Sequence, residues 1–305
     1  MPSQPPVRAL RTDSVFGRVL TAMVTPFRPD GSLDVEAAEK LACWLVDQGN
    51  EGLVVNGTTG EAPTTTDAEK TDIIRAVSAA VGDRCTIVAG VGTNDTAHTV
   101  ELARQAERAG ADGVLVVTPY YNKPPQEGLI AHFTAVADAT ELPNILYDIP
   151  GRSGIPIAVD TLIRLSEHPR ICAVKDAKGD FWAATEVMRA TDLAWYSGND
   201  GDNLLHLAQG GVGLIGVTSH VASPQYARMI AAVDAGDLAG AQQIHRDLVP
   251  AVNAVMNITQ GAIMSKAALV ELGVLAHPTV RLPLIEATPE QRVRLRDGLV
   301  ASGLL

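Results

Sequence analysis

The sequence is short of positive charge, of cysteine and of long apolar runs, and each shortage excludes a class of protein. Its 24 lysines and arginines are outnumbered by 35 acidic residues, which gives a net charge of −11 and a pI of about 5.1. Such a surface argues against binding nucleic acids or anionic membranes, although a local arginine can still bind a small anion. No apolar run approaches the roughly 20 residues of a membrane span.

The three cysteines, Cys43, Cys85 and Cys172, are far apart and form no CxxC pattern. A small, odd and scattered set of thiols predicts neither a zinc site nor a redox motif, and it is consistent with a reducing cytoplasm. Residues 1–13 are polar and contain proline, without the apolar segment of a secretory signal. We therefore expect a cytoplasmic protein with a flexible N-terminal arm at 1–13.

Nucleotide-binding motifs are missing as well, since no GxGxxG follows the first strand and no GK[ST] follows a glycine-rich loop. What the chain contains is an alternation of short β-rich runs with helical segments. Eight such units predict a closed parallel barrel, whereas the missing GxGxxG disfavours a doubly wound open sheet. The expected strands are Val19–Met23, Gly52–Val55, Thr86–Gly90, Gly113–Val117, Asn144–Asp148, Ile171–Lys175, Ala194–Ser197 and Gly213–Gly216.

After the eighth unit the pattern changes, because residues 236–305 contain no convincing strand. Apolar periods there predict three further helices, at Gly240–Met256, Gly261–Leu272 and Pro289–Val300. We therefore predict an α/β protein in which a (β/α)8 TIM barrel at 14–235 carries a C-terminal three-helix extension at 236–305. The length of 305 residues suits a barrel with additions.

Lys175 closes the apolar run Ile171–Val174 and precedes a polar stretch that we interpret as a loop. In a (β/α)8 barrel the active site lies at the C-terminal ends of the strands. A lysine buried there has a lowered pKa and can form a Schiff base with a carbonyl substrate. The alternative is an ammonium that simply reaches solvent from the strand end. We expect the other five lysines to stay solvated, namely Lys40, Lys70, Lys123, Lys178 and Lys266.

Other strand ends carry polar groups too. The loop after the second strand holds two glycines with Thr58 and Thr59, whose hydroxyls and neighbouring amides can bind a carboxylate. Tyr147 ends the fifth strand, and Arg152 follows it with a guanidinium suited to a carboxylate. Each of these residues alone also fits an ordinary turn or an exposed loop. Together with Lys175 they predict a Schiff-base enzyme that acts on a keto acid.

These motifs resemble those of the pyruvate-dependent class I aldolases, the dihydrodipicolinate synthase/N-acetylneuraminate lyase family. Within it the chain is most similar to the dihydrodipicolinate synthases of actinobacteria, which share the double threonine Thr58-Thr59 and Arg152. The resemblance covers about residues 17–305. It depends on Gly57–Glu61, Thr118–Pro124, Tyr147–Gly154 and Val174–Asp176.

The resemblance implies a lyase that condenses pyruvate with L-aspartate-4-semialdehyde, the first committed step of the diaminopimelate route to L-lysine. It implies that Lys175 forms an imine with pyruvate, that Tyr147 moves protons beside it, and that Thr58 links Tyr147 to Tyr121 across a dimer interface. It also implies a homotetramer, a dimer of dimers, with no metal or organic cofactor. The implied substrate contacts are Thr59 for the pyruvate carboxylate, Arg152 for the semialdehyde carboxylate, and Gly198 and Ile215 along the pocket.

Two alternatives remain at this point. One is another aldolase of the family, acting on a sugar acid or a hydroxy-oxoglutarate; Arg152 and Thr58 argue against it. The other is a non-catalytic sensor of keto acids, which predicts a broken relay, whereas the four implied catalytic residues are all present. For either tyrosine of the pair Tyr120-Tyr121, a role as a hydrophobic plug or interface residue fits slightly better when the residues are read alone. After the seventh strand, Ser197–Asp200 replaces the two adjacent acids of many relatives, and we expect no catalytic consequence.

Lysine-inhibited members of the family bind their effector in a cleft beside the tyrosine pair. The resemblance matches the asparagine and tyrosine of that cleft with Asn94 and Tyr120, but it puts Asp67 and Lys70 at histidine positions and His98 at a glutamate position. The glutamate would meet a cationic amine, and His98 cannot supply its negative charge. We therefore expect weak or absent inhibition by L-lysine.

Overall fold

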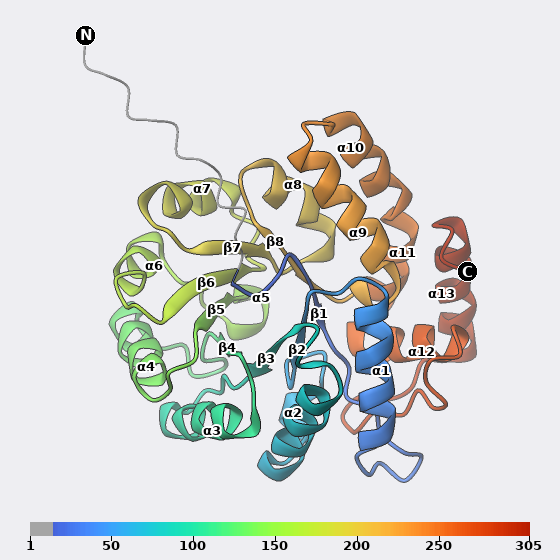
Figure 1. Cartoon of the computed structure of the whole chain (residues 1–305), viewed down its shortest axis with the longest axis horizontal. Coiled ribbons are helices and arrows are strands. Elements are labelled where there is room, and N and C mark those ends of the chain that lie inside the picture. The colour runs from blue at the N-terminus through green and yellow to red at the C-terminus, as the bar shows by residue number, and fades with distance from the viewer. Residues whose placement is uncertain (1–14) are drawn as a thin grey trace.

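A computed structural model describes residues 15–305, so the arm expected at 1–13 lies outside the described residues. Figure 1 shows a ring of strands surrounded by helices. The strands pair in parallel from β1 to β8, and β8 pairs with β1, which closes the predicted barrel. They are β1 (Val19–Ala22), β2 (Gly52–Val55), β3 (Thr86–Gly90), β4 (Gly113–Val117), β5 (Asn144–Asp148), β6 (Ile171–Asp176), β7 (Ala194–Ser197) and β8 (Gly213–Gly216).

Helices follow the strands and cover the barrel, and their starts have local causes. The side chain of Asp34 accepts the Ala37 N–H and begins α1. Thr66 and Glu69 form a capping box at the start of α2. The covering helices are α1 (Val35–Asp47), α2 (Asp67–Val81), α3 (Thr96–Ala109), α4 (Gln126–Asp138), α6 (Val159–Leu165), α7 (Phe181–Ala190), α8 (Asn203–Ala208) and α9 (Ser219–Asp234). Short helices follow three strand ends, namely η1 (Ala62–Thr64), α5 (Pro150–Ser153) and η2 (Asp200–Asp202).

The barrel interior is a packed core rather than a channel. Phe16 fills the end where the strands begin, and it fits because Gly113 has no side chain: a Cβ there would lie 2.5 Å from the Phe16 ring. Toward the opposite end of the barrel polar groups enter the interior. One of them is the phenol of Tyr147, which belongs to the same cluster of buried residues. The interior apolar residues include Leu20, Val54, Val88, Leu115, Ile145, Ala173 and Ile215.

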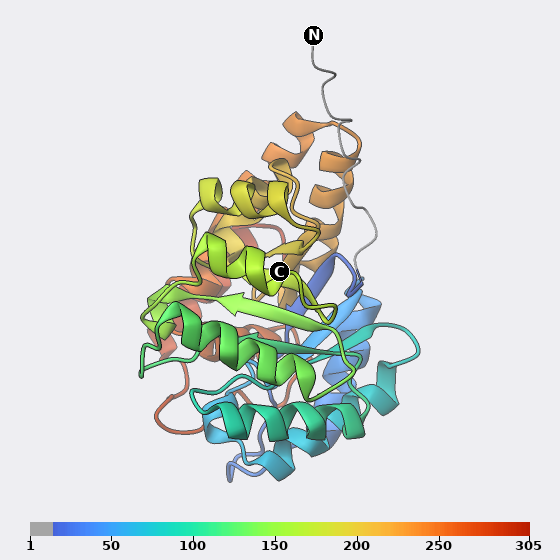
Figure 2. The ribbon, with the colours of Figure 1, turned by 90° about the vertical axis from the view of Figure 1, so that its left-hand side faces the viewer.

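Four C-terminal helices follow α9 and lie on one side of the barrel (Figures 1 and 2). They are α10 (Leu238–Asp247), α11 (Val249–Met256), α12 (Gly261–Glu271) and α13 (Pro289–Ala301). The prediction of a single helix at Gly240–Met256 is therefore wrong. The helix is interrupted at Leu248, because Pro250 has no N–H with which to continue the hydrogen-bond pattern. Within residues 15–305, no helix is both long and apolar enough to cross a membrane.

Candidate active site

Lys175 and Tyr147 lie side by side on neighbouring strands, as predicted. In the β5–β6 ladder Tyr147 is the register partner of Lys175. Side chains of a strand alternate between its faces, so both of these point into the barrel. The Lys175 Nζ lies 4.4 Å from the centre of the Tyr147 ring, and the two residues are only 4% and 6% exposed. The amine is thus held in a dry site next to a phenol.

Burial determines the protonation of this pair. It lowers the pKa of Lys175 from 10.5 to about 7; the Asp200 carboxylate opposes this and the Arg152 guanidinium adds to it. At pH 7 about half of the Lys175 amines are then neutral, against roughly one in three thousand for an ordinary lysine. Burial also raises the pKa of Tyr147 to about 12, with Arg152 acting against the shift. Lys175 therefore has the large neutral fraction that a nucleophilic amine requires, and Tyr147 stays a protonated phenol at neutral pH.

Of the expected pocket residues, Gly198 packs against Lys175 and Ile215 lies in the barrel interior. A Cβ on Gly198 would lie 2.9 Å from the Lys175 Cγ, so the lysine stem passes where only a glycine leaves room. Ile215, in β8, is fully buried and belongs to the same interior cluster as Tyr147. Gly198 thus adjoins Lys175, and Ile215 lines the same interior.

Asp200 is a residue whose importance the sequence reading missed. It is 2% exposed, and its carboxylate accepts the Val217 N–H at 3.1 Å, the Thr218 N–H at 2.9 Å and the Thr218 hydroxyl at 3.0 Å. It joins the end of β7 to the end of β8 and supplies the negative charge that acts on Lys175. The prediction that the departure at 197–200 has no catalytic consequence stays a prediction. What the sequence analysis did not single out is the structural role of Asp200, and its place directly after a strand was the signal.

The loop after β2 lies on the same face of the barrel. Thr59 is 7% exposed, and Thr58 is half-buried. The Glu61 N–H donates to the Thr58 carbonyl at 3.1 Å, and the Thr25 hydroxyl donates to the Gly60 carbonyl at 2.7 Å. These bonds fold the loop tightly around its two threonines.

Arg152 and Tyr121 stand at the edge of the site. Arg152 lies in α5 and is exposed, yet its charge lowers the pKa of both Lys175 and Tyr147. Tyr121 is 88% exposed and has a positive φ of 73°. Within residues 15–305 no hydrogen bond joins Thr58 to either tyrosine, so the single chain does not display the implied relay.

Behind the reactive pair, on the outer face of the same strands, lies a second polar group. Asp148 and Asp176 follow Tyr147 and Lys175 directly and are register partners. The Lys178 Nζ lies 3.3 Å from the Asp148 Oδ2. The backbone N–H of Lys178 donates to the Asp176 carboxylate at 2.8 Å. Burial raises the pKa of Asp148 to about 6, with Lys178 acting against it. These contacts join β5 to β6 and so help to fix the register of the pair.

The expectation that all other lysines are solvated is wrong for Lys70 and Lys266. Lys70 is 9% exposed and donates to the Thr65 carbonyl. Lys266 is fully buried and forms an ion pair with Glu61. The partner of Lys266 is distant in sequence, which a local pattern cannot show.

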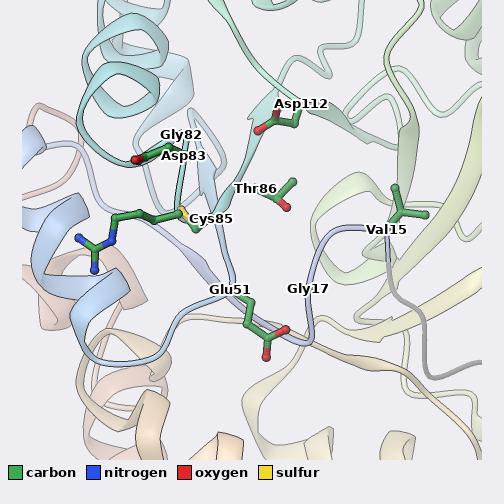
Figure 3. A pocket seen from close by; sticks show the side chains of 9 residues that line it. Val15, Gly17, Glu51, Gly82, Asp83, Cys85, Thr86 and Asp112 are labelled. Atoms are coloured by element: carbon green, nitrogen blue, oxygen red, sulfur yellow. The ribbon is translucent and has the colours of Figure 1, made fainter.

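A hollow lies at the opposite end of the barrel. Its volume is about 530 Å³, and it lies where β1 to β4 begin, beside Gly17, Glu51, Thr86 and Asp112 (Figure 3). Catalytic groups of such barrels lie at the other ends of the strands, so this hollow does not belong to the site. Residues 15–305 contain no cluster of side chains that could hold a metal ion.

Comparisons with known proteins agree with this geometry. The profile of the Dihydrodipicolinate synthetase family matches residues 15–302. A 4-hydroxy-tetrahydrodipicolinate synthase of Kineococcus radiotolerans is 58% identical over 304 residues, covering 100% of this chain and 98% of that protein. A dihydrodipicolinate synthase structure from Bacillus anthracis superposes with a TM-score of 0.91 and 43% identity, covering 93% of this chain and 98% of that one.

A third relative, from Acinetobacter baumannii, is a chloride-inhibited dihydrodipicolinate synthase whose structure was solved in complex with pyruvate. It superposes with a TM-score of 0.90 at 37% identity, and the match covers 94% of this chain and 99% of that one. The matches extend over the barrel and the C-terminal helices alike. The chain belongs to the Dihydrodipicolinate synthetase family.

Proposed function

We propose that this chain is a lyase that condenses pyruvate with L-aspartate-4-semialdehyde to 4-hydroxy-tetrahydrodipicolinate, through an imine on Lys175. The observation that carries the proposal is the buried amine of Lys175 against the Tyr147 ring, with a pKa near neutrality. The name of the Kineococcus radiotolerans relative, which matches along the whole chain, supports the choice of substrates.

The reaction follows from the chemistry of a neutral amine. Lys175 attacks the ketone of pyruvate, and water leaves to give a protonated imine. This imine withdraws electrons, so the pyruvate methyl group loses a proton and an enamine forms. The enamine carbon attacks the aldehyde of the second substrate. The amino group of that substrate then attacks the imine carbon, which closes the ring and releases Lys175.

Other residues support these steps in the proposal. Tyr147, a protonated phenol at neutral pH, moves protons at the imine, and Thr58 connects it to Tyr121 of a neighbouring subunit; such acid–base help is worth about 10²–10⁴-fold. Thr59 and nearby amides hold the pyruvate carboxylate, and Arg152 holds the carboxylate of the semialdehyde. The lysine itself supplies the electron sink, so the scheme uses no further cofactor.

The assembly is part of the proposal. We place the enzyme in the cytoplasm as a homotetramer, a dimer of dimers, with a catalytic barrel at 14–235 and a helical domain at 236–305. Large aromatic side chains left exposed on the single chain support association, since Tyr121 is 88% and Trp182 75% exposed. The helical domain has its own apolar cluster around Ala251, Met264 and Leu295.

Trapping of the imine tests the proposal. Borohydride reduction in the presence of pyruvate should attach the substrate to the peptide that contains Lys175. Lys175→Ala should abolish both the adduct and turnover, whereas Lys123→Ala, at an exposed position of the same face, should keep the adduct. An adduct on Lys178 or Lys266 would contradict the assignment. A panel of aldehydes and sugar acids decides between the condensation and the other aldolase reactions of the family.

A further inference from the structure

Lys266 is a buried lysine of helix α12 that plays no part in the steps above. Its side chain is 0% exposed. Its Nζ lies 2.5 Å from the Glu61 Oε1 and donates to the Thr279 carbonyl at 2.7 Å. The ammonium also lies 4.3 Å from the centre of the Phe27 ring. A charge this far from water is kept only where such partners replace its hydration.

Glu61, the partner of Lys266, ends the loop that carries Thr58 and Thr59. It is 3% exposed, and its second carboxylate oxygen accepts the backbone N–H of Arg281 at 2.9 Å. Both oxygens are therefore held by the C-terminal extension, one by a helix and the other by the segment that follows. The Glu61 carboxylate thus joins the loop to the extension at two points, and a third contact is made by the Arg281 guanidinium, which donates to the Thr64 carbonyl at 2.8 Å.

The shape of the loop depends on Glu61 staying in place. Its φ of 57° lies in the left-handed region, which a glutamate rarely adopts. Its N–H closes a turn onto the Thr58 carbonyl at 3.1 Å, and its carbonyl accepts the Thr64 N–H at 3.0 Å. A backbone outside its preferred region persists only where the surroundings hold it. The contacts of the Glu61 carboxylate with Lys266 and Arg281 provide that hold.

We propose that Lys266 is a positioning residue for the condensation: by holding the Glu61 carboxylate, it fixes the turn after Thr59 and with it the hydroxyls of Thr58 and Thr59. The inference rests on the proposed function, in which Thr59 binds the pyruvate carboxylate and Thr58 relays protons. It gives the C-terminal extension a part in shaping the site, in addition to any part in stability.

A second anchor of the same segment offers a matched control. The Arg281 guanidinium donates to the two carboxylate oxygens of Glu69 at 2.6 and 2.9 Å. Glu69→Gln weakens this anchor while leaving both contacts of the Glu61 carboxylate in place. Lys266→Met keeps an unbranched side chain of similar length and removes the charge and the donors. Both variants loosen the extension, but only Lys266→Met removes a partner of the Glu61 carboxylate. Glu69→Gln leaves the donor that Arg281 gives to the Thr64 carbonyl in place.

Kinetics and hydrogen exchange, measured well below the melting temperature of each variant, separate the two roles. In Lys266→Met, kcat should fall by about ten- to a hundredfold, because a displacement of about 1 Å can cost on the order of a hundredfold. The KM for pyruvate should rise and that for the semialdehyde should not. Amides of residues 57–64 should exchange faster. Glu69→Gln should keep kcat and both KM values within about twofold of the parent.

A folded Lys266→Met enzyme with parental kinetics and parental exchange would overturn the proposal. If Lys266→Met does not fold, Glu61→Gln replaces it, because the amide has the same shape without the charge; the same directions of change are expected, and parental behaviour again overturns the proposal. A parent protein that fails to condense the substrates overturns the proposed function instead. The exchange comparison needs no substrate and still decides whether Lys266 holds the loop.

Discussion

At the scale of single residues, two buried lysines show how partners decide chemistry. Burial lowers the pKa of Lys266 only to about 8, because the Glu61 carboxylate at 2.5 Å favours its charged form. The Lys175 amine forms no hydrogen bond within residues 15–305, and its pKa falls to about 7. Only Lys175 therefore combines a large neutral fraction with an unengaged lone pair, which a nucleophile requires.

The first prediction concerns pH. The neutral fraction of Lys175 grows as pH rises through about 7 and saturates above it, since its pKa is lowered to that value. The kcat/KM for pyruvate, which reports the free enzyme, should therefore rise between about pH 6 and 8 and level off before pH 9. A profile that keeps rising toward pH 10 would mean an ordinary, solvated lysine. Steady-state rates at saturating semialdehyde measure it.

The second prediction concerns Arg152. Arg152→Ala removes a charge-assisted contact worth about 1.5–3 kcal/mol, so the KM for the semialdehyde should rise by about ten- to a hundredfold. Because Arg152 also lowers the pKa of Lys175, both proteins should be compared across the whole pH profile, so that a change in that pKa is not mistaken for a change in substrate binding. Arg164→Ala, which loses only an exposed pair with Glu127, is the control. Equal effects on both substrates would point to a structural role.

At the scale of elements, helices α2 and α3 meet over a cluster that bears on regulation. The Asp67 Oδ2 lies 3.0 Å from the His98 Nε2, and its other oxygen lies 3.9 Å from the Lys70 Nζ. The Asp67 carboxylate thus already contacts His98 and Lys70. It is therefore not available to replace the glutamate that would bind a cationic effector.

The third prediction is that L-lysine inhibits weakly or not at all. Losing one charge-assisted contact costs about 1.5–3 kcal/mol, or about ten- to a hundredfold in affinity. Titration of L-lysine against initial rate at subsaturating pyruvate checks this, with His98→Glu as the variant expected to gain sensitivity. Half-inhibition of the parent well below about 1 mM would contradict the interpretation of the cluster.

Elements also show what a sequence can predict. Strands such as Gly113–Val117 lie at their predicted residues because a buried parallel strand is a continuous local run between turns. Lys175 and Tyr147 could be placed together because each ends such a run. The split between α10 and α11 follows from Pro250 and could have been predicted from the sequence. The pair Glu61–Lys266 could not, since a buried partner distant in sequence leaves no local mark at either residue.

At the scale of the whole molecule, the proposed relay requires a second chain. Tyr121 is exposed at a left-handed backbone position, and no hydrogen bond within residues 15–305 brings it to Thr58. Holding a bulky aromatic residue in this conformation costs on the order of 1–3 kcal/mol. Such a cost is reasonable where the ring serves a neighbouring subunit.

The fourth prediction therefore concerns mixed assemblies. Tyr121→Phe and Lys175→Ala should each inactivate the enzyme, but for different reasons. If Tyr121 serves the neighbouring site, mixing the two variants under conditions of subunit exchange should restore some turnover, because a hybrid dimer contains one site with both groups. Mass measurements confirm that hybrids form. Hybrids without activity would mean that Tyr121 acts within its own chain.

The contact between Glu61 and Lys266 spans 205 residues of the chain, and this separation has a consequence for biosynthesis. At about 5–20 residues per second, the ribosome needs roughly 10–40 s to reach Lys266 after Glu61 has been made. Throughout that interval the Glu61 carboxylate lacks the Lys266 ammonium that holds it in the folded protein. The first loop of the site to be translated is thus among the last to acquire its final shape.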